Sequence, residues 1–259
     1  MRKAGRVGAG GQETGRDARL LRASVAAVWI ATGVAVLHPY YRAIGEAYLE
    51  PLGLPAWVMW ATCAFEVGLG AWVVKVPANR LDTALQVGMV VTFTLILAAT
   101  EPMLMASPYG VLSKNLPLLA VLVTAMLVVQ EGWSPRALWL LRGGVAIIWI
   151  TEGIVPKILF QQAVELNVVA ASGLVPFDPS VFLVILGVAQ AVSGVLALVL
   201  RGRVLLWLLY CQAAALVVLP LLVSIQDPLL WVHPFGPMTK NIPIIVGTLM
   251  VARRCSSPS

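Results

Sequence analysis

Ionisable side chains inside long apolar stretches are the residues of this sequence best placed to do chemistry. Glu66, Glu152 and Lys157 lie in such stretches, and Lys240 opens another. A charge in a membrane is costly unless it is paired, and two acids with two lysines form a neutral set. We take Glu152, Lys157 and Glu66 as candidate catalytic residues, because a buried acid or lysine can transfer a proton. Two interpretations stay open: a functional cavity, or interhelical ion pairs that hold a bundle together.

Lys240 belongs to a motif that occurs twice. The segment 233–243 matches 107–117, which lies 126 residues earlier, and five of the ten positions from Pro108 to Pro117 are identical. Each copy is a Pro-aromatic-Gly turn followed by a hydroxyl residue, Lys, Asn and Pro, a pattern typical of a loop that enters a helix. A lysine there opposes the helix dipole, so it needs a counter-charge, an anionic ligand or solvent.

The candidate ligand-binding residues follow from this motif and from an internal repeat. In the repeat, Gln190 is the counterpart of Glu66, and Thr32 is the counterpart of Glu152. We expect the site in the second half, with Lys240 close to Glu152 and with fewer charges around its counterpart. The full candidate set is Lys240, Asn241, Lys114, Asn115, Gln190 and Thr32.

Pro156 predicts a break in the helix that carries Glu152 and Lys157. Proline has no N–H, so the Glu152 carbonyl loses its helical partner and the helix kinks. Irregular backbone at membrane depth occurs where it lines a cavity or is buried in protein. The matching turn of the first half, 32–37, has no acid, proline or lysine, which favours the second half as the active one.

The elements that position these residues are membrane helices. The chain is 59% hydrophobic and 12% charged, with a mean hydropathy of +0.89, whereas soluble domains have about 25% charged residues. The composition therefore excludes a soluble domain. We predict eight transmembrane helices, in an all-α integral membrane protein, at about 22–38, 56–75, 82–100, 115–131, 137–158, 180–200, 203–223 and 241–253.

The basic residues predict the orientation of these helices. Fourteen of the eighteen lie in the tail or in connections that share one side. The positive-inside rule places both termini in the cytoplasm, in a multi-pass protein of a bacterial inner membrane. This distribution accounts for the net charge of +6, so the lipid bilayer is the expected partner and nucleic acid is not.

The chain divides into a tail and two tandem four-helix repeats. We expect residues 1–19 to be a disordered cytoplasmic tail, 20–131 the first, diverged repeat, and 137–253 the second. An even number of helices per repeat gives both the same orientation, related by a pseudo-two-fold axis along the membrane normal. The outer segments 40–55 and 160–179 are candidates for interfacial helices or lids.

Cofactor motifs are not evident. His38 and His233 are the only histidines; turn residues are the favoured interpretation, and haem or metal ligands the alternative. The three cysteines form no close pair, so we predict no metal site. Trp149 is more consistent with core packing than with a quinone platform. A bound quinone is the one candidate cofactor.

The second half resembles the DoxX-like family of bacterial membrane proteins. The resemblance rests on Trp149, Glu152-Gly153 and Pro156-Lys157, followed by the motif 234–243. That family is related to the membrane subunit of thiosulfate:quinone oxidoreductase, so the resemblance implies an accessory or subunit role in quinone-linked redox chemistry beside a redox partner protein. A small-solute or lipid transporter, or a membrane enzyme acting on an isoprenoid, are the alternatives. Whether the chain is an enzyme stays open.

Overall fold

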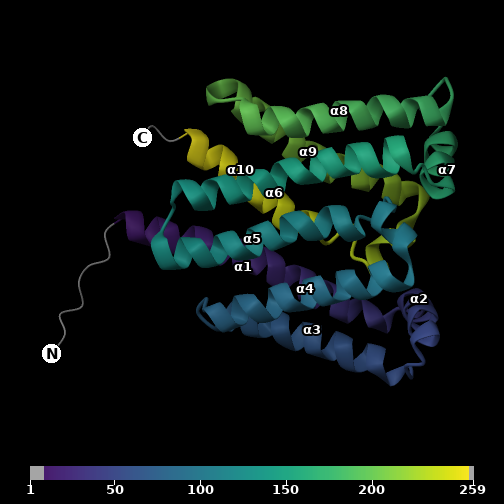
Figure 1. Ribbon diagram of the computed structural model, residues 1–259, viewed down its shortest axis with the longest axis horizontal. Helices are drawn as coiled ribbons and strands as arrows, with labels where there is room; N and C mark the ends of the chain where they lie inside the picture. Colours follow the sequence, from purple (N-terminus) through teal and green to yellow (C-terminus); the bar gives the residue numbers. More distant parts are fainter. Residues whose placement is uncertain (1–8, 257–259) are drawn as a thin grey trace.

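The computed structural model describes residues 9–256, and every regular element in that range is helical. Figure 1 shows long helices running roughly side by side, with short helices at one end. The first half contains α1 (Ala9–Val34), α2 (Pro39–Leu49), α3 (Trp57–Lys75), α4 (Arg80–Thr100) and α5 (Val111–Glu131). The second contains α6 (Pro135–Ile154), α7 (Ala163–Ser172), α8 (Pro179–Val199), α9 (Gly202–Gln226) and α10 (Asn241–Ser256).

The two halves have the same order of elements. In each, a long helix is followed by a short helix, two long helices, a 3₁₀ turn and a final helix. The helices α1, α5, α6 and α10 pack against one another in the centre, with α3 on α1 and α8 on α6. Figure 1 shows α3 and α4 along one side of this centre and α8 and α9 along the other. This order supports an internal repeat; the pseudo-two-fold axis stays a prediction.

Glycines allow the closest helix contacts. A Cβ added to Gly153 would lie 2.3 Å from the carbonyl oxygen of Gly187, so α6 and α8 meet at backbone distance. In the first half, a Cβ on Gly33 would lie 2.6 Å from the carbonyl oxygen of Cys63, between α1 and α3. Small residues at such contacts are how membrane helices gain packing without a hydrophobic driving force. The Glu152 turn therefore lies directly against α8.

Seven helices within residues 9–256 are long and apolar enough to span a membrane, by length and composition. The predicted eighth, α10, forms, but it has 16 residues and is about 24 Å long, short of the roughly 30 Å hydrocarbon core. The eight-span count is thus not confirmed. The predicted outer segments contain α2 and α7, and Figure 1 shows both at the same end of the molecule.

The N-terminal segment differs from its prediction. We expected 1–19 to be disordered, but α1 begins at Ala9, so 9–19 is helical, while 1–8 lies outside the described residues. A long-range contact accounts for the difference. Asp17 forms an ion pair of 3.1 Å with Arg253, pairs also with Arg254, and accepts a 2.9 Å hydrogen bond from Trp133. These contacts tie the start of α1 to the end of α10, at the end of the bundle opposite α2 and α7.

Candidate functional site

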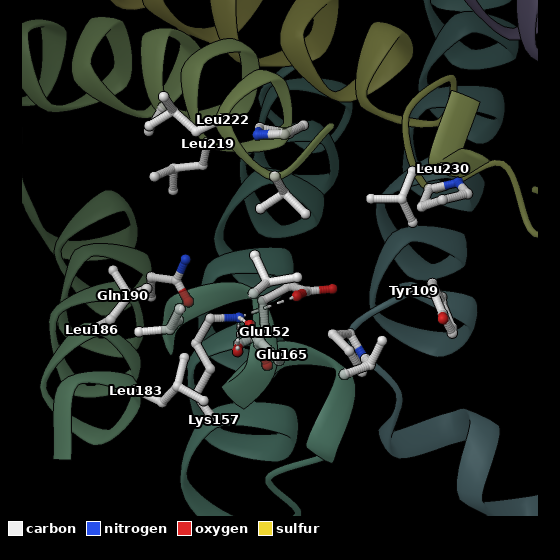
Figure 2. A pocket seen from close by; sticks show the side chains of 18 of the residues that line it. Tyr109, Glu152, Lys157, Glu165, Leu183, Leu186, Gln190, Leu219, Leu222 and Leu230 are labelled. Atoms are coloured by element: carbon white, nitrogen blue, oxygen red, sulfur yellow. Dashed lines mark hydrogen bonds and ion pairs between the residues drawn. The ribbon is translucent and has the colours of Figure 1, made fainter. Parts of the chain in front are cut away.

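A cavity of about 330 Å³ lies in the second half, between α8 and α9 and against α6. The short helix α7 and the first residues of α10 complete its wall, together with Tyr109 and Lys114 from the first half. Figure 2 shows leucines on several sides of the space, with acidic and basic side chains grouped in one part of it. The site is thus an apolar cavity with one charged region.

The charged region is built around Lys157. Its ammonium nitrogen lies 3.0 Å from the nearest carboxylate oxygen of Glu165 and 3.7 Å from that of Glu152. Glu152 also accepts a hydrogen bond from the Ser113 hydroxyl of α5. Lys157 is buried, and both acids are largely covered. Lys157 thus places a positive charge within 4 Å of each acid, which lowers the cost of burying them.

Glu165 was missed by the sequence analysis. It lies on α7, in the outer segment that we predicted only as an interfacial helix or lid. The available signal was an acid within a short apolar stretch after the broken helix. With Glu165 and the buried Lys114 included, the set has three acids and three lysines, in place of the predicted two and two.

The predicted break at Pro156 is present. The α-helix ends at Ile154, and a π-helical turn runs from Val155 to Leu159. The Lys157 ammonium donates a 3.3 Å hydrogen bond to the Glu152 carbonyl oxygen, the group that Pro156 cannot reach with an N–H. The π turn also directs Lys157 towards the cavity that it lines.

The lysine expected beside Glu152 is the wrong one. Lys114, in α5, lines the cavity and interacts electrostatically with Glu152, whereas Lys240 interacts with Glu66 in the first half. Each motif lysine therefore interacts with an acid of the opposite half. Both α5 and α10 contact α6 and α1, and the side chain of each lysine extends to the half opposite its own.

The remaining candidates of the first half lie together but away from this cavity. Glu66, on α3, is buried, with one carboxylate oxygen that has no hydrogen-bond partner among the described residues. Thr32, on α1, lies beside it, and the Thr32 hydroxyl donates to the Val28 carbonyl at 2.8 Å. None of the ion pairs within 4 Å in the described range includes Glu66 or Lys240, so their interaction is longer.

The two motif asparagines brace the neighbouring helix. Asn241 donates a 3.1 Å hydrogen bond to the Leu216 carbonyl, which lies four residues before Pro220 in α9. Pro220 has no N–H to offer that carbonyl, so Asn241 replaces the missing helical donor. In the first half Asn115 donates to the Thr94 hydroxyl at 2.7 Å. Of the two, Asn241 lines the cavity.

The tryptophans at equivalent positions differ between the halves. The Trp29 indole N–H donates a 3.1 Å hydrogen bond to Gln86, but the Trp149 indole N–H is buried without a partner in the described range. Gln212, the counterpart of Gln86, is turned to Ser193 instead. Trp149 and Gln190 both line the cavity. It is a further candidate contact residue, which the sequence analysis had assigned to core packing.

The histidines occupy turns. His233 accepts a 3.3 Å hydrogen bond from the Phe235 backbone N–H, and its ring stacks on Tyr109 at 4.4 Å between centroids. Burial, and then the positive charge of Lys240, lowers the pKa of His233 to about 4, so the ring is neutral at pH 7. His38 accepts from the Tyr40 backbone N–H at 3.2 Å. Among residues 9–256, no three His, Cys, Asp or Glu side chains group as metal ligands.

The fold and cavity define a multi-pass helical membrane protein with an amphipathic ligand-sized cavity between its helices. The family model of the DoxX-like family matches residues 26–123 and 146–249, one segment in each half, and the chain belongs to this family. No curated protein and no solved structure matches the chain.

Proposed function

We propose that the protein binds a membrane quinone in its second half and acts as a subunit or accessory in membrane redox chemistry. The observation that carries the proposal is the grouping of buried polar side chains on one part of an otherwise apolar cavity. Its volume of about 330 Å³ falls at the lower end of the roughly 300–1,000 Å³ of ligand sites, a size that suits a head group with the start of its tail.

The residues that line the cavity suit the two parts of a quinone. Trp149 and Lys114 offer hydrogen-bond donors for ring oxygens, within reach of the charged group around Lys157. Leu183, Leu186 and Leu219, from α8 and α9, offer apolar walls for an isoprenoid tail. The ligand enters from the bilayer between α8 and α9, whose mutual contacts are few.

The acids supply a route for protons. Reduction of a quinone to a quinol takes up two electrons and two protons. Glu152 and Glu165 flank Lys157 and can exchange protons with a ring oxygen in the cavity. The electrons come from a redox partner protein, since the sequence has no dinucleotide, haem or cluster motif. The basic connections support a bacterial inner membrane with both termini in the cytoplasm.

The test is to identify the ligand that co-purifies with the protein. Gently solubilised protein is extracted with organic solvent, and quinones are quantified by mass spectrometry per mole of protein. We expect a quinone in the wild type and its loss in Trp149→Phe. Trp29→Phe, the equivalent change in the first half, is the matched control and should retain it. Absence of any quinone, also after incubation with a short-chain analogue, contradicts the proposal.

A transporter for a small solute or lipid is the second candidate. The π turn favours it, because broken helices within repeats form many transport sites. The same extraction separates the candidates: a stoichiometric phospholipid without quinone supports lipid transport. An isoprenoid-directed membrane enzyme would retain an isoprenoid other than a quinone.

A further inference from the structure

Arg142, on α6, is a buried cation without an acidic partner. It is 7% exposed, and none of the ion pairs within 4 Å among residues 9–256 includes it. Its guanidinium donates instead to two carbonyl oxygens at the end of α8, from Nε to Ala197 at 2.6 Å and from Nη2 to Leu200 at 2.5 Å. The last carbonyls of a helix carry about half a negative charge, so part of the charge on Arg142 stays uncompensated.

The equivalent arginine of the first half has an acid. Arg22 forms a 2.8 Å ion pair with Asp82, which lies in the first turn of α4. The repeat shift of 126 that relates Gln86 to Gln212 places Leu208 at the position of Asp82. The second half therefore keeps the buried cation and has an apolar residue in place of its counter-ion. A buried charge without a partner is costly, which favours an anion from outside these residues.

Further positive charge gathers beside Arg142. Arg201 lies close enough to act on it electrostatically. Arg201 and Arg203 are exposed where α8 passes into α9, and neither takes part in an ion pair within 4 Å in the described range. The helix α9 begins at Gly202 without a side-chain cap and without an acid in its first turn. Its N-terminal dipole therefore adds to the positive potential of the arginines.

The free donor of Arg142 is accessible. Its Nη1 has no hydrogen-bond partner among residues 9–256, and it is not one of the unpartnered atoms that are closed off from solvent. The guanidinium carbon lies 4.8 Å from the ring centroid of Trp139, a side chain that is 52% exposed. The charged group of Arg142 thus borders the surface of the bundle. Accessible guanidinium N–H groups suit phosphate oxygens, which accept charge-assisted hydrogen bonds.

We propose that Arg142, Arg201 and Arg203 bind the phosphate group of an anionic phospholipid. Figure 1 shows the α8–α9 connection at the same end of the molecule as the C-terminal end of α10, opposite α7. The positive-inside rule places this end at the cytoplasmic leaflet, whose anionic lipids attract basic side chains. The source of the phosphate is a lipid because apolar surface for acyl chains adjoins the arginines in sequence: Val199, Val204 and Trp207 are 68%, 62% and 72% exposed.

The experiment compares a charged and a neutral lipid on the same protein. Delipidated full-length protein in a neutral detergent is titrated with phosphatidylglycerol or phosphatidylcholine, and bound lipid is counted by native mass spectrometry. We expect phosphatidylglycerol to bind about tenfold more tightly, since each arginine near a phosphate contributes about 1 kcal/mol. It should also raise the melting temperature, whereas inorganic phosphate at the same concentration should not.

Two double variants locate the site. Arg201→Gln with Arg203→Gln should abolish the preference for phosphatidylglycerol, and the fold should persist because both side chains are exposed. Lys75→Gln with Arg80→Gln is the matched control. It removes the same charge from the equivalent connection of the first half, where Asn79 caps α4, and should retain the preference.

Three results would overturn the proposal. Equal binding of the two lipids by the wild type would show that the arginines select no anionic head group. An equal loss in both double variants would show general attraction by positive charge. A melting temperature raised as much by inorganic phosphate would show a free anion in place of a lipid. None of these measurements depends on the proposed quinone site.

Discussion

The ammonium group of Lys114 donates a 2.5 Å hydrogen bond to the carbonyl oxygen of Pro237. These residues belong to the two copies of the repeated motif, 123 positions apart in the chain. This hydrogen bond joins the two motif loops where the halves meet. The lysine of the first copy also lines the cavity of the second half. Gly110, with φ +74°, makes this possible, because a Cβ there would lie 2.6 Å from the Lys114 side chain.

The placement of Lys114 in the cavity wall predicts different roles for Lys114 and Lys240. Lys114→Met should abolish quinone retention, because it removes a cation from the cavity wall. Lys240→Met should retain quinone and chiefly lower the melting temperature, because Glu66 loses its nearest cation. The measurement is bound quinone per mole beside thermal unfolding in detergent. Loss of quinone in the Lys240 variant alone would restore the assignment first expected from the sequence.

The Lys157 group predicts a compensating double mutant. Lys157→Met leaves two acids without their cation and should destabilise the fold by about 3–5 kcal/mol, the cost of breaking a buried pair. Glu165→Gln in the same chain should recover part of that loss, because its carboxylate lies closest to the ammonium. Thermal unfolding of the single and double mutants measures the coupling. Strict additivity would show that the 3.0 Å contact carries no coupling energy.

The contact between α6 and α8 predicts a position that tolerates no side chain. Gly153→Ala should lower stability by about 1–3 kcal/mol, because its Cβ overlaps the Gly187 carbonyl and the helices must separate. Gly143→Ala is the control in the same helix, where an added Cβ meets nothing within 4 Å. It should be neutral or stabilising by up to about 1 kcal/mol. Similar melting temperatures for the two variants would disprove the close approach.

Cys255 tests the orientation of the chain. It is partly exposed at the end of α10, beside basic residues that the positive-inside rule places in the cytoplasm. A membrane-impermeant maleimide should label it in inverted vesicles and not in intact cells. The protein also carries Cys63→Ser and Cys211→Ser, so that Cys255 is the one cysteine that can be labelled. Labelling of Cys255 in intact cells would contradict the predicted topology and indicate the opposite orientation.

The fold was predictable where the signal is local. Pro156 indicates the broken helix through one missing N–H, and the apolar stretches indicate seven spans. The start of α1 at Ala9 was not predictable, because Asp17 is held by residues at the far end of the chain.

The residues that line the cavity were predicted only in part, and their partners were not predicted: Glu165 was missed, and Glu66 lies elsewhere. Glu152 and Lys157 form a pair, as their turn indicated. Which lysine joins them depends on whether α5 or α10 packs on that part of α6, and the repeat makes both residues equivalent in sequence. Trp149 is exceptional only because Gln212 turns away from it, which is a matter of side-chain packing.

Photocrosslinking tests the central claim, a quinone held in the second-half cavity, most directly. A short-chain azidoquinone is irradiated with the protein in nanodiscs, with and without excess unlabelled quinone, and the labelled peptides are mapped by mass spectrometry. We predict competable labelling in 179–226, which contains α8 and α9, and its loss in Lys114→Met. Competable labelling confined to the groove between α3 and α4, or labelling that excess quinone leaves unchanged, would contradict the claim.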